Sequence, residues 1–128
     1  MKKALWIAVC IMTMPLQALA GSGDVEGTWQ LARDFDLDGR ISSNAKRHQV
    51  ECNSHHNKFV CRYIGADRTN DSIFAGETYQ ARTTKIISFF QYDATYYVTH
   101  SGREQGRHRF VGTWYDVAGN AGDFELRK

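Results

Sequence analysis

The sequence contains a single proline, three cysteines and no apolar run long enough to span a bilayer as a permanent helix. It also has no serine nucleophile elbow, no phosphate-binding glycine loop and no metal-hydrolase motif. The acidic residues are scattered through candidate strands, where such residues are usually surface groups. We therefore expect a protein that is not an enzyme and needs no cofactor.

Excess charge is lacking once the first residues are set aside. Met1-Lys2-Lys3 leads into an apolar segment from Ala4 to Met14, Pro15 interrupts it, and Ala18-Leu19-Ala20 forms a small-x-small cleavage site. This order is typical of a bacterial signal peptide. Removing the two lysines lowers the basic count from 16 to 14, which equals the 14 acidic residues, so the formal net charge falls from +2 to zero.

Export fixes several expectations for the remaining chain. We expect residues 1–20 to be the signal peptide and residues 21–128 to form a single domain in the periplasm or outside the cell. Gly21 stands where a lipid anchor would need a cysteine, so no membrane anchor is expected. A neutral chain offers no electrostatic basis for binding nucleic acid. The oligomeric state stays open.

Cys52 and Cys61 are the cysteines that remain after cleavage. In an oxidising compartment such a pair predicts a disulfide. If His56-Asn57 form a two-residue turn, the two cysteines face each other across a hairpin. The bond would contribute roughly 2–3 kcal/mol because it closes only a short loop.

Two alternative interpretations place a metal site at histidine residues. Cys52, His55, His56 and Cys61 have a conceivable ligand spacing, although exported thiolates rarely stay reduced. His48 and His100 could face a barrel mouth and bind zinc, but no short motif sets their geometry.

Short strands and polar turns account for nearly everything after Gly23, and no segment has a convincing helical period. This pattern predicts an all-β fold, an antiparallel up-and-down barrel of about eight strands, with a small sandwich as the alternative. Turns are expected at Asp38-Gly39 and Ser101-Gly102, among others. The expected strands are Val25–Arg33, Lys46–Asn53, Lys58–Ile64, Ile73–Thr83, Lys85–Tyr92, Thr95–Ser101, Arg107–Tyr115 and Asp123–Arg127.

One tripeptide occurs twice, as Gly27-Thr28-Trp29 and as Gly112-Thr113-Trp114. Alternation along a strand places the glycine and the tryptophan of each copy on one buried face. Two such strands near opposite ends of the chain favour a barrel that closes between its first and last strands.

The first copy resembles the Gly-x-Trp signature of calycin barrels, the superfamily of lipocalins and avidins. The resemblance implies a calycin-like fold in which Trp29 packs across the barrel floor and a basic residue of the last strand stacks over it. Arg127 is placed to be that residue. The second copy, continued by Tyr115, is similar to the opening strand of avidins. No specific ligand follows from the resemblance.

The segment that follows the first strand resembles half of a calcium loop. Asp34, Asp36 and Asp38 occupy its first three acidic positions and Gly39 follows them. Ala45 stands where the bidentate acid should be. Calcium binding by the three aspartates is the metal hypothesis, and a polar loop is the alternative.

The aromatic residues supply the candidate ligand-binding positions. Strands that carry large groups on both faces are either covered twice or expose an apolar patch, which we expect around Phe89, Tyr97 and Tyr115. Trp29, Trp114 and Phe110 would border a ligand in the barrel.

Three functions follow, in order of preference. The first is binding or inhibition of another protein, such as a secreted hydrolase or a toxin. The second is capture of a small apolar or aromatic molecule in the barrel mouth. The third is a barrel-mouth enzyme or metal-binding protein.

Overall fold

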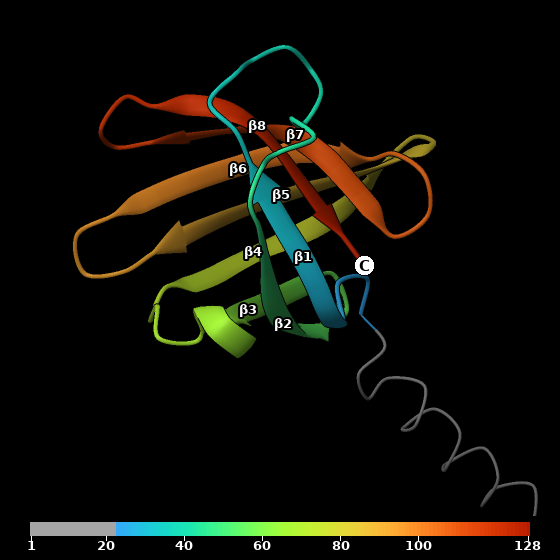
Figure 1. Cartoon of the computed structure of the whole chain (residues 1–128). Helices are drawn as coiled ribbons and strands as arrows, with labels where there is room; N and C mark the ends of the chain where they lie inside the picture. The colour runs from blue at the N-terminus through green and yellow to red at the C-terminus, as the bar shows by residue number, and fades with distance from the viewer. Residues whose placement is uncertain (1–22) are drawn as a thin grey trace, which may run out of the picture.

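The computed structural model describes residues 23–128, so the expected signal peptide and its cleavage site lie outside the described residues. The chain forms a closed barrel of eight antiparallel strands, in which each strand pairs with the next and β8 pairs with β1 (Figure 1). The prediction of an up-and-down barrel is confirmed, and the sandwich alternative is wrong because β1 and β8 close the sheet. The strands are β1 Gly27–Arg33, β2 Arg47–His55, β3 Lys58–Tyr63, β4 Ile73–Ala81, β5 Thr84–Tyr92, β6 Tyr97–Glu104, β7 Arg109–Asp116 and β8 Ala121–Arg127.

Inward-facing side chains fill the barrel. Burial alternates along β2 and β3, as expected of strands with one face in a core and one in solvent. Among the described residues, no helix is long and apolar enough to cross a membrane. The buried apolar core comprises Val25, Trp29, Leu31, Val50, Cys52, Phe59, Cys61, Tyr63, Phe74, Ile87, Phe89, Val98, Phe110, Trp114, Phe124 and Leu126.

The β2–β3 hairpin is pinned by the predicted disulfide. Cys52 and Cys61 are directly opposite in the register and are bonded to each other. The hairpin turns at His56-Asn57, where His56 adopts a left-handed conformation with φ of 56°. These thiols are therefore not metal ligands, and the alternative site at Cys52, His55, His56 and Cys61 is wrong.

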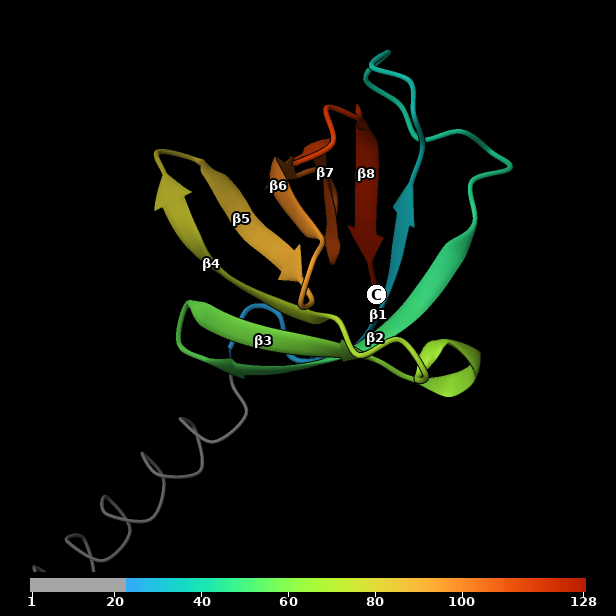
Figure 2. The ribbon, with the colours of Figure 1, turned by 90° about the vertical axis from the view of Figure 1, so that its left-hand side faces the viewer.

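One end of the barrel, here called the floor, is closed by residues 23–26. The Thr78 hydroxyl donates a hydrogen bond of 2.6 Å to the Asp24 carboxylate, and Lys85 lies 2.9 Å from the same carboxylate. Val25 is buried beneath the strands. The C-terminus lies beside the start of β1 at this end (Figures 1 and 2). The opposite end is the mouth, from which the loop of residues 34–46 extends beyond β1 (Figure 2).

The prediction of a turn at Ser101-Gly102 is wrong, because β6 continues through this pair to Glu104. Gly102 lies directly opposite Gly112, and the two backbones approach so closely that a Cβ on Gly112 would lie 2.1 Å from the Ser101 carbonyl oxygen. The glycine is thus required by a close contact between strands rather than by a turn.

Candidate functional site

The outer face of β5–β7 exposes aromatic side chains near the mouth. Phe90 pairs with Thr99 and Tyr92 with Tyr97 in the register, and Phe90 and Tyr97 stack with ring centroids 5.4 Å apart. Tyr115, opposite Thr99 on β7, is 60% exposed. We call this group, Phe90, Tyr92, Tyr97 and Tyr115, the aromatic band.

The expected patch is corrected at one position. Phe89 faces the interior, where it is buried and stacks on His100, and its neighbour Phe90 faces outward. Of the other residues expected to bind a ligand, Trp29 and Phe110 are core residues at the floor end. Trp114 is also buried, but its ring borders a hollow at the mouth.

A groove of about 860 Å³ continues the same outer face away from the aromatic band. Ile86 and Val111 give it apolar walls, whereas Arg40 and Arg103 supply positive charge. Arg103 makes no ion pair within the part of the chain that the structure describes. The outer face of β5–β7 therefore combines exposed rings with an unneutralised cation.

The mouth of the barrel is polar. Arg33 points inward from the end of β1, and its Nη1 donates a hydrogen bond of 2.8 Å to Oε1 of Gln91. Gln91 in turn donates through Nε2 to the Tyr63 hydroxyl at 3.2 Å. The Tyr96 hydroxyl donates to the Asp116 carboxylate at 2.8 Å. An apolar ligand would meet charged and hydrogen-bonding groups at this entrance.

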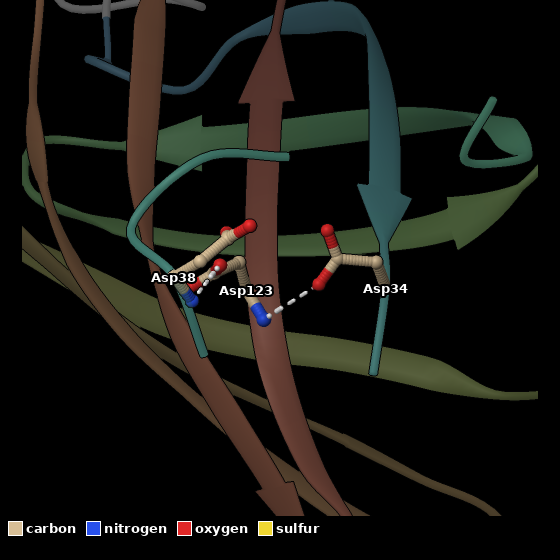
Figure 3. Close-up of side chains that lie close together, drawn as sticks. All are labelled: Asp34, Asp38 and Asp123. Atoms are coloured by element: carbon tan, nitrogen blue, oxygen red, sulfur yellow. Dashed lines mark hydrogen bonds between the residues drawn. The ribbon is translucent and has the colours of Figure 1, made fainter. Parts of the chain in front are cut away.

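Three aspartates meet outside the barrel, on β8 and the β1–β2 loop. Asp34, Asp38 and Asp123 each offer a carboxylate oxygen within 4.8 Å of the others (Figure 3). Asp36 contributes only its backbone N–H, which donates to the Asp34 carboxylate at 3.1 Å. The structure thus brings together two of the three expected calcium ligands and replaces the third by Asp123.

Backbone hydrogen bonds already occupy much of this cluster. Asp123 Oδ2 accepts from the N–H groups of Asp38 and Gly39, both at 3.0 Å, and Asp34 Oδ2 accepts from Ser42 N–H at 2.8 Å. Burial raises the pKa of Asp123, and the adjacent Asp38 carboxyl raises it further. The carboxylates fasten the loop to β8, and calcium binding stays a prediction.

Asp123 was missed as a member of this cluster because it lies far along the chain. It lies close to the Gly119-Asn120 turn, where aspartate side chains typically cap the backbone. Asp116 does cap that turn, since its Oδ1 accepts from the N–H groups of Ala118 and Asn120. No local pattern shows that Asp123 faces the loop after β1.

The two histidines considered for zinc occupy different environments. His48 borders the mouth, whereas His100 is fully buried and stacks on Phe89 at 4.2 Å. Neither ring nitrogen of His100 has a hydrogen-bond partner among the described residues. Burial, reinforced by the positive charge of Arg33, holds the pKa of His100 well below its usual value. In the described part of the chain, the three-aspartate cluster is the one group of three or more potential ligands close enough together to hold a metal ion, and it includes no histidine.

The basic residue over the floor tryptophan is Lys128 rather than Arg127. The Lys128 ammonium lies 5.8 Å from the centroid of the Trp29 ring and donates to the Glu26 carbonyl at 2.9 Å. Arg127 lies on the outer face of β8, 3.8 Å from Glu125. Alternation along β8 explains the correction, because Arg127 faces outward with Glu125.

Comparison with family models, curated proteins and solved structures found no match to this chain.

Proposed function

We propose that this protein is an exported, non-catalytic binding protein of calycin-like architecture that docks on another protein through the outer face of β5–β7. The observation that carries the proposal is the aromatic band, in which three tyrosines are exposed and Phe90 is half-buried, on the outside of a barrel already filled by its own side chains. A secreted hydrolase or a toxin is the proposed class of partner.

The chemistry of this face favours a protein surface as its occupant. Tyrosine and arginine are enriched in protein interfaces and at the positions that dominate their binding energy. The rings of Tyr97 and Tyr115 would meet an apolar centre of the partner. Arg103 in the adjoining groove would meet an acidic group, since no residue of the described chain neutralises it.

Rigidity supports the same function. The outer face of β5–β7 is part of a closed sheet, and its hairpins are short. A disulfide also pins the hairpin of β2 and β3. Docking such a surface orders few groups that were free beforehand, so little binding energy is lost to conformational entropy.

The test begins with affinity capture from periplasmic and culture extracts on the immobilised domain. The affinity of each purified captured protein is then measured for the wild type and for the Tyr97→Ser, Tyr115→Ser double variant. We expect a loss of about a hundredfold or more if the band holds two dominant contacts.

Val60→Ser is the control, because Val60 is 44% exposed but lies on β3, opposite Ala75 of β4 and away from β5–β7. It should leave the affinity unchanged. A partner that binds the double variant as tightly as the wild type would overturn the proposal, as would failure to capture any protein.

A further inference from the structure

Arg33 is a cation without a counter-ion at the mouth of the barrel. Its guanidinium donates one hydrogen bond to Gln91 and lies 5.7 Å from the centroid of the Trp114 ring. Across the described residues, no carboxylate forms an ion pair with it. The side chain is nevertheless only partly exposed, on the inward face of β1.

Three arginines on the outer surface, from β2, β7 and β8, are paired, unlike Arg33. Glu125 is buried, and its carboxylate lies 2.6 Å from Arg47, 2.6 Å from Arg109 and 3.8 Å from Arg127. Hydrogen bonds from Arg109 and Arg47 hold the pKa of Glu125 down although its burial acts in the opposite direction. Withdrawing a charge from water is unfavourable unless it is paired, so the absence of a partner at Arg33 needs an explanation.

Two hollows meet at Arg33. One of about 230 Å³ is lined by polar groups that include Ser72 and Gln91, and one of about 180 Å³ is lined by Phe35, Lys46 and Trp114. Arg33, His48 and Tyr96 line both. Each is smaller than the roughly 300–1,000 Å³ typical of pockets for drug-sized ligands. The space therefore suits a small molecule near the rim, above the filled interior.

Two acids beside the mouth, among the described residues, are held in turns of the chain. Asp93 Oδ1 accepts from the N–H groups of Thr95 and Tyr96, both at 2.9 Å. Asp116 accepts from the Tyr96 hydroxyl in addition to the turn that it caps. These contacts hold both carboxylates in place, so neither moves onto Arg33 without breaking a turn.

We infer that the mouth binds a small carboxylate that carries an aromatic or apolar group. The guanidinium of Arg33 accepts the carboxylate, because its planar set of donors matches the two oxygens, and Lys46 adds a second positive charge. The apolar part of the ligand lies against Phe35 and Trp114. This site is separate from the outer face of β5–β7, and either assignment can fail without the other.

The test uses benzoate and phenylacetate as probes, with benzamide and benzyl alcohol as neutral analogues of similar shape. In two-dimensional NMR of the wild type, the carboxylates should shift the indole N–H of Trp114 saturably, while Trp29 at the floor stays unchanged. The neutral analogues should bind at least about tenfold more weakly, as expected when a charged hydrogen bond is lost.

Arg33→Gln should weaken benzoate binding by about tenfold or more, whereas Arg103→Gln, which removes an unpaired arginine from the outer face, should leave it unchanged. If Arg33→Gln does not fold, the wild-type titration still decides the matter. Equal binding of carboxylates and neutral analogues would overturn the inference, and so would carboxylate-induced shifts confined to the outer face, or the absence of any shift.

Discussion

The two copies of Gly-Thr-Trp lie at opposite ends of the barrel. Trp29 belongs to the floor and Trp114 to the mouth, and in both the indole N–H donates to a backbone carbonyl oxygen. The acceptor is Glu26 for Trp29, at 3.1 Å, and Asp34 for Trp114, at 2.8 Å. Each tryptophan thus fastens the chain segment that adjoins β1 at its own end of the barrel.

The cations over the two rings show how the ends differ. Lys128 completes the floor, because it also donates to the Glu26 carbonyl and so ties the end of the described chain to its beginning. Arg33 closes nothing and borders two hollows. The same tripeptide therefore supports a sealed end and an open end, and what decides between them is the neighbouring chain.

Exchanging the glycine of each copy for alanine should give the largest difference between them. A Cβ at Gly112 would lie 2.1 Å from the Ser101 carbonyl oxygen, a backbone atom that cannot move away alone. Gly112→Ala should reduce the free energy of unfolding by about 3 kcal/mol or more, as severe overpacking does. Gly27 has room but adopts φ of 94°, so Gly27→Ala should cost about 1–2 kcal/mol.

Urea unfolding followed by tryptophan fluorescence measures both values, and circular dichroism shows whether Gly112→Ala folds at all. Equal losses in the two variants would mean that the sheet relaxes around Gly112 and that the close approach is not rigid.

The stability of the protein should depend on pH through His100, which is buried in the core beneath the mouth. His100 stays neutral when folded because its pKa is lowered, whereas in the unfolded chain it takes up a proton near its usual value of 6.5. The unfolded state therefore gains protons as the pH falls through 6.5, and the folded state loses stability. His100→Leu should remove this part of the slope.

The stability of His100→Leu relative to the wild type should accordingly rise below pH 6.5, by up to about 1.4 kcal/mol per pH unit. Urea unfolding of both proteins at a series of pH values gives this difference. Parallel curves for the two proteins would show that His100 takes up a proton in the folded state as readily as in the unfolded chain.

Removing the cations should give the smallest effect and the sharpest contrast. Lys128→Gln should lower the free energy of unfolding by about 0.5–1 kcal/mol, because it weakens the floor contact with Trp29. Arg33→Gln should leave stability within about 0.5 kcal/mol of the wild type, because the loss of its contacts with Trp114 and Gln91 is offset by the removal of a half-buried charge that has no counter-ion. A larger loss in Arg33→Gln than in Lys128→Gln, measured by the same urea unfolding, would assign Arg33 a structural role.

Most of the fold could be predicted from alternation and turn residues. The register of the β2–β3 hairpin follows from the spacing of Cys52 and Cys61 around His56-Asn57, and it is found as predicted. Gly102 shows where this reasoning fails. A Ser-Gly pair is typical of turns, and only the position of Gly112 on the neighbouring strand shows that this glycine is needed inside a strand.

The candidate sites were less accessible to sequence analysis, because they depend on which strands become neighbours. Phe89 and Phe90 are adjacent and chemically identical, and only the register shows which of them faces outward. Asp123 joins Asp34 because β8 pairs with β1. The unpaired state of Arg33 depends on every side chain around the mouth, so no local pattern could predict it.

Closure of the sheet between β1 and β8 also has a consequence for the kinetics of folding. Leu31 pairs with Leu126 and Arg33 with Phe124, so the seam joins segments from nearly opposite ends of the described chain. Contacts so distant in sequence form late and slow the search for the native state. Hairpins such as β2–β3 can form first, but both edges of the growing sheet stay unprotected until β8 arrives.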